Sequence, residues 1–286
     1  MKMLSLFSGV GMIDLAASWA GIETVAMNKE NQHKETLPYG VVSSEGINLY
    51  NGDCLEIMKN IADKSVDMIL CDLPYGTTAC KWDIIIPFDK LWEQYERIIK
   101  DNGAIVLTAS QPFTTVLNQS NLKIFRYEWI WIKNNTTGFQ LANKMPLKKH
   151  ENISVFYKKL PTYNPQGLQA YGKTNKRGSA GNGGHLANEC NQYIQQFTNY
   201  PTQLLEFAYD KDKLHPTQKP VALFEYLIKT YTNDGETVLD NCMGSGTTGV
   251  ACQHLNRNFI GIELDENYFN IAKQRIEKAH ETKELF

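Results

Sequence analysis

The short stretch "CDLPYG", at residues 71–76, brings together groups that could hold a flat ring carrying an amino group. Tyr75 could stack on the ring, while the Asp72 carboxylate and the Leu73 backbone carbonyl each accept one amino hydrogen. Pro74 would fix the backbone so that both acceptors point outward. Holding both hydrogens draws the nitrogen lone pair out of conjugation, so the nitrogen could attack an electrophilic methyl group. A strand that simply ends in an aspartate-containing turn is the alternative interpretation.

A second stretch, "VLDNCMGSGTTGV" from Val238, is typical of a turn that binds a nucleotide-like cofactor. Gly244 and Gly246 would let the backbone approach a ligand closely, and Thr247 would open the helix behind them. Glu263 follows Gly244 by 19 residues, at the end of the next predicted strand, where its carboxylate could accept both ribose hydroxyls. The third glycine of a dinucleotide fingerprint is not at its usual spacing, which favours a different adenosine-bearing cofactor.

The elements that must position these residues alternate between buried strands and amphipathic helices. Strands are predicted at 65–76, 103–110 and 236–246, and the helix between the first two is expected to stop at Asn102 and Gly103. Strand, helix and strand in that order imply parallel pairing with a right-handed crossover. The segments "YEWIWIKN" and "ENISVFYKK" predict an antiparallel edge pair. The chain therefore predicts an open, mostly parallel α/β sheet, which binds ligands at the carboxyl ends of its strands.

The composition is that of an ordinary soluble globular protein. With 286 residues, 42% hydrophobic and 21% charged, the chain can bury one substantial core, so one main domain with additions is expected. No apolar run approaches the ~18 residues of a membrane span, and polar residues interrupt the apolar start, which argues against a secretory signal. The six cysteines form no CxxC pair and no metal-binding spacing. This pattern indicates buried, reduced thiols in a cytoplasmic protein and no metal site.

Positive charge is concentrated in one segment of a chain whose net charge is −2. From Lys144 to Arg177 there are eight lysines and arginines and one acid, Glu151. Such a segment can contact a phosphate backbone, although a basic run can also be solvated surface. It overlaps a polar insert at 161–213 that shows no sustained periodicity, and inserts of this kind are usually functional or disordered. The candidate phosphate contacts are Lys148, Lys149, Lys173, Lys176 and Arg177.

Three motifs, "DLPYG", "HPTQKP" and "LDNCMGSGTTGVA…NRNFIGIELDENYFNIAKQRI", together resemble the β-group amino-methyltransferases of DNA, which use S-adenosylmethionine. The resemblance spans Asn48 to His280 and implies a Rossmann-like, mostly parallel, seven-stranded sheet with a circularly permuted motif order. It implies that the catalytic residues are Asp72, Leu73, Pro74 and Tyr75. The implied cofactor-binding residues are Asp53 near the adenine, His215, Thr217 and Lys219 at the methionine end, and Asp240, Gly244, Gly246, Thr247 and Glu263 around the turn and ribose.

Two positions depart from the family pattern. Leu73 replaces the commoner first proline of the tetrapeptide, which should matter little because only its backbone carbonyl is needed. Asn241 and Cys242 stand where the family often has Pro-Phe, so an aromatic contact to the cofactor is missing.

A second glycine turn, "LSLFSGVGMIDL" from Leu4, competes for the same role. The start of the chain resembles the cytosine 5-position methyltransferases, but the chain lacks the Pro-Cys nucleophile and the Glu-Asn-Val of that family. Only one glycine-turn strand can lie beside the strand that bears Asp72, and only the Val238 copy is followed by a ribose carboxylate. Residues 1–45 are therefore predicted to be an appended segment, and 46–286 the methyltransferase domain, with 161–213 as its target-recognition insert.

The resemblance implies methyl transfer to the N6 amino group of adenine in a specific double-stranded DNA sequence, because aspartate at position 72 is commoner in the adenine enzymes. The base would be flipped into the pocket, and the transfer would be direct, with no covalent enzyme intermediate. Alternatives are N4-cytosine methylation, an RNA or free-base substrate, and a non-catalytic DNA-binding or phage accessory protein. A homodimer, a cognate restriction enzyme and a nucleoid-associated place in the cytoplasm are compatible with the expected function.

Overall fold

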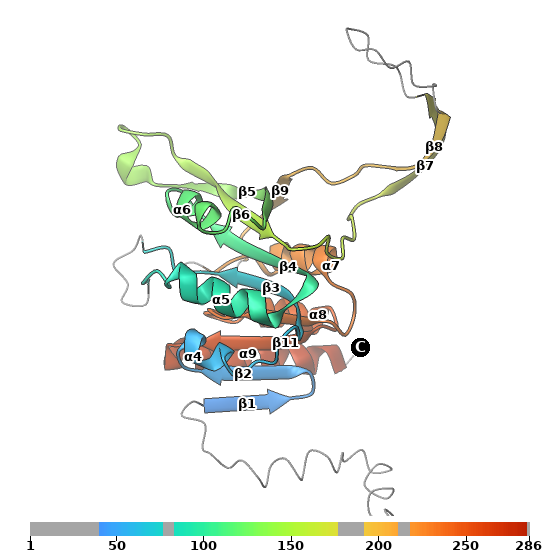
Figure 1. Ribbon diagram of the computed structural model, residues 1–286. Coiled ribbons are helices and arrows are strands. Elements are labelled where there is room, and N and C mark those ends of the chain that lie inside the picture. Colours follow the sequence, from blue (N-terminus) through green and yellow to red (C-terminus); the bar gives the residue numbers. More distant parts are fainter. Residues whose placement is uncertain (1–39, 77–82, 177–191, 211–217, 285–286) are drawn as a thin grey trace, which may run out of the picture. The chain divides into compact units, whose positions relative to one another are not determined.

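The computed structural model describes residues 40–76, 83–176, 192–210 and 218–284, and a nine-stranded sheet dominates them (Figure 1). Its strand order is β1-β2-β11-β10-β3-β4-β6-β5-β9, so neighbouring strands come from distant parts of the chain. In chain order these strands are β1 (Gly40–Ser44), β2 (Ile47–Asn51), β3 (Val66–Asp72), β4 (Ile99–Ala109), β5 (Phe125–Thr137), β6 (Lys148–Phe156), β9 (Leu204–Phe207), β10 (Thr237–Asp240) and β11 (Asn258–Glu263).

Parallel pairing dominates the centre of the sheet, as the sequence predicts. β2, β11, β10, β3 and β4 are parallel, while β6 runs antiparallel to both of its neighbours, β4 and β5. The seven strands from β2 to β5 correspond to the expected seven-stranded sheet. The described sheet is wider, because β1 is added beside β2 and β9 pairs in parallel with β5. The antiparallel pair is present, but β9 rather than this pair forms the edge.

Helices cover both faces of the sheet. One set consists of α4 (Cys54–Met58), α5 (Phe88–Ile98) and α6 (Phe113–Ser120), and the other of α7 (Val221–Tyr231), α8 (Thr247–His254) and α9 (Glu266–Glu284). Successive side chains of a strand point to opposite faces, and those of Met68, Ile69, Leu70 and Cys71 are all fully buried. β3 is therefore covered on both sides, as expected for a parallel sheet.

The helix predicted between the first two strands is present as α5, but it ends earlier than expected. Its apolar side chains Leu91, Trp92, Tyr95 and Ile98 are buried, and Phe88 is half-buried. Ile99 begins β4, so the strand starts before the predicted stop at Asn102 and Gly103. A Cβ at Gly103 would lie 2.7 Å from the carbonyl oxygen of Asp67 on β3. Gly103 thus permits the close approach of two strands and does not end the helix.

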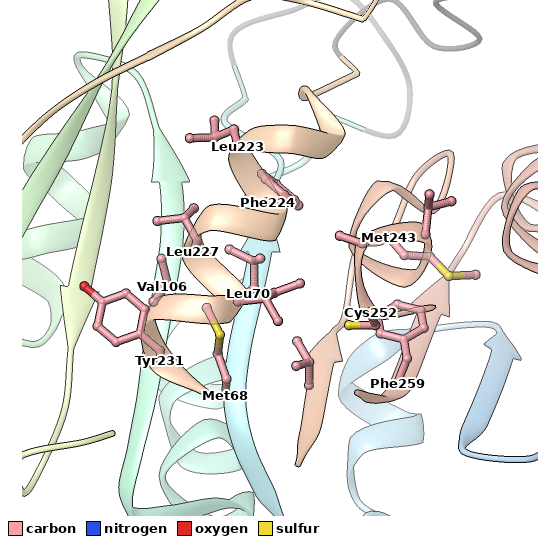
Figure 2. Packing of buried hydrophobic residues seen from close by; sticks show 14 of the residues in the cluster. Met68, Leu70, Val106, Leu223, Phe224, Leu227, Tyr231, Met243, Cys252 and Phe259 are labelled. Atoms are coloured by element: carbon pink, nitrogen blue, oxygen red, sulfur yellow. The ribbon is translucent and has the colours of Figure 1, made fainter. Parts of the chain in front are cut away.

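The apolar face of α7 packs over β3 and β4 (Figure 2). Full burial of side chains of this size contributes roughly 1.5–3 kcal/mol each. Because α7 begins directly after Lys219 and Pro220, this packing also holds Lys219 close to the end of β3. The residues concerned are Leu223, Phe224, Leu227 and Tyr231 on the helix and Met68, Leu70 and Val106 on the strands.

The polar insert at 161–213 contains more regular structure than its composition predicts. β7 (Gln169–Lys176) and β8 (Gln192–Thr198) pair antiparallel in a separate two-stranded sheet, and β9 joins the main sheet. Backbone pairing holds these strands without an alternation of apolar side chains, which is why their periodicity did not reveal them. The glycine-rich stretch "GSAGNGGH" falls within residues 177–191, which lie outside the described residues.

Most of the predicted appended segment, including the glycine turn that begins at Leu4, also lies outside the described residues. Its last residues form β1, so the described sheet begins at Gly40, before the predicted domain start at residue 46. By internal contacts the chain divides between Gly40 and Val41. In the part of the chain that the structure describes, no helix is long and apolar enough to cross a membrane.

Candidate active site

The carboxyl ends of β3 and β10 lie side by side. The two strands pair in parallel, with Val238 opposite Met68, so β3 ends at Asp72 beside the end of β10 at Asp240. A cavity of about 580 Å³ opens at this edge, and both the "DLPY" stretch and the glycine turn line it. The two motifs, far apart in the chain, therefore share one space, as the sequence predicts.

The cavity wall contains most of the proposed site residues that the structure describes. These are Asp53, Asp72, Leu73, Pro74, Tyr75, Lys219, Asp240, Gly244, Thr247 and Glu263. Gly246 is not part of the described wall, and His215 and Thr217 lie outside the described residues. The wall also contains residues that the sequence did not point to, among them Lys133, Thr137, Glu151 and Tyr209.

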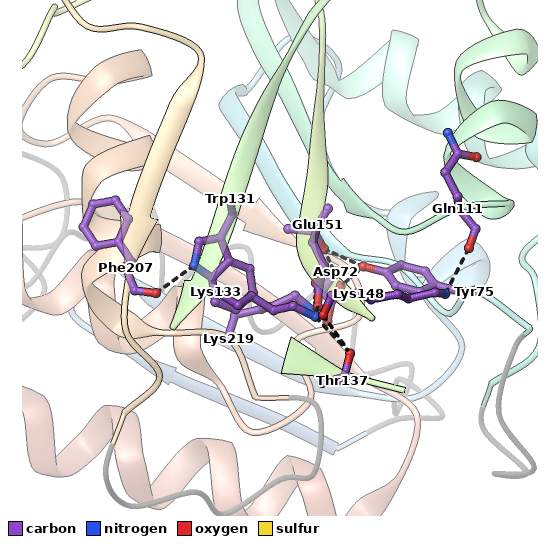
Figure 3. A network of polar contacts seen from close by, with 11 residues as sticks. Asp72, Tyr75, Gln111, Trp131, Lys133, Thr137, Lys148, Glu151, Phe207 and Lys219 are labelled. Carbon is purple, nitrogen blue, oxygen red and sulfur yellow. Dashed lines mark hydrogen bonds and ion pairs between the residues drawn. The ribbon is translucent and has the colours of Figure 1, made fainter. Parts of the chain in front are cut away.

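Side chains hold both oxygens of the Asp72 carboxylate (Figure 3). The Tyr75 hydroxyl donates to Oδ1 over 2.6 Å, and the Thr108 hydroxyl donates to the same oxygen. The Lys219 ammonium donates to Oδ2 over 2.6 Å. Thr108 lies opposite Asp72 in the parallel pair of β4 and β3. Three donors from three segments therefore fix the orientation of this carboxylate.

One face of the Tyr75 ring stacks on Phe113 at the start of α6, with ring centroids 5.0 Å apart and planes at 26°. Tyr75 also lines the cavity, and its stacking on a bound base stays a prediction. Burial first, and then the charge of Asp72, raise the pKa of the Tyr75 hydroxyl well above its usual value. The hydroxyl therefore stays protonated and donates to Asp72, while Phe113 covers one face of the ring.

Lys219 lies between two carboxylates. Its Nζ is 2.6 Å from Asp72 Oδ2 and 3.5 Å from Glu151 Oε2, and Glu151 Oε1 is 3.3 Å from Lys133 Nζ. The side chains of Lys219 and Lys133 are only 6% and 4% exposed, while those of Asp72 and Glu151 are 24% and 15% exposed, so the four groups form a partly buried, charge-balanced cluster. Burial alone lowers the pKa of Lys219, but the charges of Asp72 and Glu151 raise it well above its usual value. The ammonium therefore stays charged.

The sequence did not assign Glu151, Lys133 or Thr108 to the site. The only signal for Glu151 was that it is the one acid in the basic segment 144–177. Glu151 reaches the cavity because β6 runs antiparallel to β4, with Asn152 opposite Ala109. The spatial position of β6 beside β4 could not be derived from one sequence, so the sequence did not predict that Glu151 belongs to the site.

The two glycines of the turn have different roles. Gly244 has a φ of +52°, and no atom lies within 4 Å of the place where a Cβ would stand, so its backbone is open to the cavity. Gly246 has a φ of +80°, and a Cβ there would lie 2.9 Å from the Cβ of Ala272 on α9. Of the two glycines, Gly244 lines the cavity, while Gly246 allows α9 to pack against the turn; close ligand approach stays a prediction.

Glu263, at the end of β11, connects that strand to the glycine turn. Its Oε2 accepts the Gly244 N–H over 2.8 Å, and its Oε1 accepts the Asp265 N–H over 2.9 Å. Burial raises the pKa of Glu263 above its usual value, although these backbone bonds lower it. Each oxygen still has a lone pair with which to accept a ligand hydroxyl.

Asp53 and Asp240 brace the cavity wall. Asp53 is the N-cap of α4, and its Oδ1 accepts the Leu55 N–H over 2.8 Å. Asp240 is only 2% exposed and accepts the Cys242 N–H over 3.1 Å and the Thr248 hydroxyl over 2.5 Å. Burial raises the pKa of Asp240 to about 7. Asp240 thus supports the glycine turn from within the protein.

Asn241 and Cys242 depart from the family pattern, and the structure shows what surrounds each of them. The buried Tyr95 hydroxyl donates to Asn241 Oδ1 over 2.5 Å. Cys242 lines the cavity together with Cys54. The described cysteines are free thiols, but only Cys71 and Cys252 are buried as expected, while Cys54 and Cys242 are half-buried. Cys80 and Cys190 lie outside the described residues.

The candidate phosphate contacts come from two strands. Lys148 and Lys149 are exposed at the start of β6, and Lys173 is exposed on β7. Lys176 is the last residue of β7, and Arg177 lies outside the described residues. The structure therefore leaves the basic charge of Lys148, Lys149 and Lys173 open to solvent.

The parallel sheet, with its two motifs around one cavity at the carboxyl edge, defines a Rossmann-like α/β protein of the methyltransferase type. Residues 66–274 match the DNA methylase family N6_N4_Mtase, and the chain belongs to this family. The match includes the first two motifs on which the resemblance was based and the third up to Gln274.

Individual relatives agree with this assignment. The type II methyltransferase M.HpaI of Haemophilus parainfluenzae is 29% identical over 245 residues, which cover 79% of this chain and 72% of that protein. The type II methyltransferase M2.DpnII of Streptococcus pneumoniae is 27% identical over 285 residues, or 89% and 99% of the two chains. The crystal structure of an M1.HpyAVI-SAM complex has a TM-score of 0.55 at 29% identity, over 80% of this chain and 99% of that one. The PvuII cytosine-N4-specific DNA methyltransferase, with a TM-score of 0.60 at 15% identity over 82% and 90%, shares the fold.

Proposed function

We propose that the chain transfers the methyl group of S-adenosylmethionine to the N6 amino group of adenine in a specific sequence of double-stranded DNA. The observation that carries this proposal is the shared cavity, where Asp72 and Gly244 line the same space in a chain of the DNA methylase family. A carboxylate that can hold an amino group and a turn that can hold a cofactor are the two components that such a transfer requires.

The residues around the glycine turn fit S-adenosylmethionine. The open side of Gly244 admits a ligand to the backbone, Glu263 offers acceptors to ribose hydroxyls, and Asp53 lines the same cavity. Thr247 begins α8, whose N-terminal end favours polar ligand groups. The M1.HpyAVI-SAM complex, at 29% identity, supports the same cofactor for this chain. When bound, the cofactor would supply a methyl group carried by a sulfonium sulfur, and the remainder of the cofactor would be a neutral thioether after the transfer.

The "DLPY" stretch prepares the amino nitrogen. The Asp72 carboxylate and the Leu73 carbonyl accept its two hydrogens and so localise the lone pair on the nitrogen. As the nitrogen bonds to carbon it gains positive charge, which the Asp72 carboxylate stabilises. One N–H proton then leaves, to Asp72 or to water. The Tyr75 ring, supported on its other face by Phe113, offers an apolar wall for the base, and positioning supplies much of the rate.

The choice of adenine rests on the aspartate at position 72, and the choice of DNA on the family. The target base leaves the duplex and enters the cavity, at a cost of a few kcal/mol. The insert at 161–213 acts as the target-recognition region, and its exposed Lys173, with Lys148 and Lys149 on β6, contacts phosphates. Within the predicted appended segment 1–45, Gly40–Ser44 belong to the main sheet as β1, so the proposal places the methyltransferase domain of this cytoplasmic protein from Gly40 onward. A homodimer and a cognate restriction enzyme are compatible with this function.

Nucleoside analysis of modified DNA tests the proposal. The purified chain is incubated with unmethylated duplex DNA and S-adenosylmethionine carrying a deuterated methyl group, and the digested DNA is analysed by mass spectrometry. Labelled N6-methyladenine is the expected product, and mapping its positions gives the recognition sequence. If labelled N4-methylcytosine were found instead, the target base would be cytosine and not adenine. No label in duplex DNA, while both cofactor and DNA bind, would contradict methyl transfer.

A further inference from the structure

The Asp72 carboxylate has no oxygen that is free of protein donors. Oδ1 accepts the hydroxyls of Tyr75 and Thr108, and Oδ2 accepts the ammonium of Lys219. A charge-assisted bond of 2.6 Å is a strong one. Oδ1 already accepts two donors, so an amino group that enters must donate to Oδ2 and share that oxygen with the Lys219 ammonium.

A cation at this place also opposes the proposed chemistry. The amino nitrogen gains positive charge as it accepts the methyl group, and Lys219 carries a positive charge next to the oxygen that should stabilise it. Like charges at close range in a partly buried site repel strongly, because the effective dielectric constant is low. The reaction therefore proceeds better when the Lys219 ammonium has moved away from Asp72.

Glu151 offers the ammonium another place. Its Oε2 is buried and, within the described part of the chain, accepts no hydrogen bond, although it lies only 3.5 Å from Lys219 Nζ. Its Oε1 faces Lys133 Nζ at 3.3 Å, which keeps the carboxylate from turning away. A buried polar atom without a partner costs free energy, so Oε2 gains when the ammonium moves closer.

We propose that Lys219 exchanges Asp72 for Glu151 when the target amino group enters the cavity, and that Glu151 is the positioning residue for this exchange. The inference rests on the proposed transfer to an amino group. The cluster keeps two ammonium groups and two carboxylates throughout, so no net charge enters or leaves the cavity wall. Asp72 Oδ2 loses one donor and receives another, and Glu151 Oε2 receives its first.

The exchange makes the cavity selective for bases that carry an amino group. An amino group replaces the donor that Asp72 loses, so Oδ2 always has a hydrogen-bond donor. A base with a carbonyl oxygen at that position offers no donor, so Lys219 stays on Asp72 and the base is not held. Lys219 thus stays bound to Asp72 until another hydrogen-bond donor arrives.

The substitution Glu151→Gln tests the exchange, because it keeps the size of the side chain and removes its charge. Lys219 then has no second carboxylate and stays on Asp72. We expect the single-turnover rate of methyl transfer to fall roughly tenfold to a hundredfold, the effect of one charge-assisted hydrogen bond, with cofactor affinity unchanged. Glu206→Gln, at an exposed carboxylate on β9, is the matched control and should leave the rate unchanged.

A binding comparison separates this role from a structural one. The affinity is measured for duplexes with adenine, or with purine lacking the amino group, at the target position. The wild-type chain should prefer adenine roughly tenfold, the Glu151→Gln variant should lose most of that preference, and Glu151→Asp should retain part of it. Thermal unfolding of each variant accompanies these measurements.

Two results would overturn the inference. One is a Glu151→Gln variant with the wild-type rate and the wild-type preference for adenine. The other is a loss of cofactor affinity or of folding in both the Gln and the Asp variants, which would assign Glu151 a structural role. A wild-type chain that modifies no DNA would instead overturn the proposed function itself, so the two failures are distinguishable.

Discussion

The two ends of the cavity are built by different means. At the cofactor end, backbone amides of the glycine turn and of the next loop satisfy the Glu263 carboxylate. At the Asp72 end, side chains meet from separate segments, Thr108 on β4, Glu151 on β6 and Lys219 before α7. The first end depends on local turn geometry and is rigid, because its donors belong to the main chain. The second depends on side-chain ion pairs, which can change partners.

The largest effect should follow from Asp72→Ala, which removes the acceptor at the side-chain end. Methyl transfer should fall by roughly a thousandfold or more, since a group that stabilises developing charge is lost. Cofactor affinity should stay within about twofold of wild type, because the backbone end does not use Asp72. Single-turnover methyl transfer and calorimetric titration with S-adenosylmethionine measure the two quantities. Loss of both methyl transfer and cofactor affinity would mean that the two ends of the cavity do not act independently.

A matched pair of glycine substitutions probes the backbone end. Gly246→Ala should destabilise the fold by about 2–5 kcal/mol, because it combines a positive φ with a steric clash against Ala272. Gly244→Ala should cost only about 1–2 kcal/mol, from φ alone, but should weaken cofactor binding because its Cβ would project into the cavity. Urea unfolding and cofactor titration distinguish them. Equal loss of stability in both variants would contradict the separate roles of these glycines.

Glu263→Gln should affect cofactor affinity and little else. We expect the dissociation constant for the cofactor to rise about tenfold, the effect of hydrogen bonds to a charged acceptor. The rate of methyl transfer at saturating cofactor should not change. Burial raises the pKa of Glu263, so the wild-type carboxylate is ionised above that pKa and becomes protonated as the pH falls through it. The wild-type affinity should therefore decline towards that of the Gln variant at low pH. Titrations across pH check this, and parallel curves for the two proteins would exclude Glu263 as the titrating group.

The same contrast explains how much the sequence could predict. The strand ends, the glycine turn and Glu263 follow from local patterns, and the structure places them around one cavity. The helix α5 was predicted too, although its end was misplaced because Gly103 serves strand packing. Local patterns cannot show that β6 lies beside β4, and Glu151 reaches the site only through that pairing. The contacts of Lys219 were missed for the same reason.

The ribbon of β7 and β8 was the least predictable region. Its strands lack apolar alternation, and their pairing, with Lys176 opposite Gln192, rests on backbone hydrogen bonds. The composition of the insert indicated a functional loop without regular structure. A two-stranded ribbon with exposed basic and aromatic side chains still fits a role in binding, since Lys173 and Tyr171 are both open to solvent.

The smallest effect should come from Lys173→Ala on that ribbon. A single exposed phosphate contact contributes little, so DNA affinity should fall by roughly twofold to fivefold, and the slope of log affinity against log salt should decrease by about 0.9. Cofactor affinity should not change, because Lys173 does not line the cavity. Lys59→Ala, at an exposed lysine paired with Glu56 on α4, is the control and should leave the slope unaltered. If both variants lowered the slope equally, DNA binding would depend on overall charge, and the insert would lose its special role in target recognition.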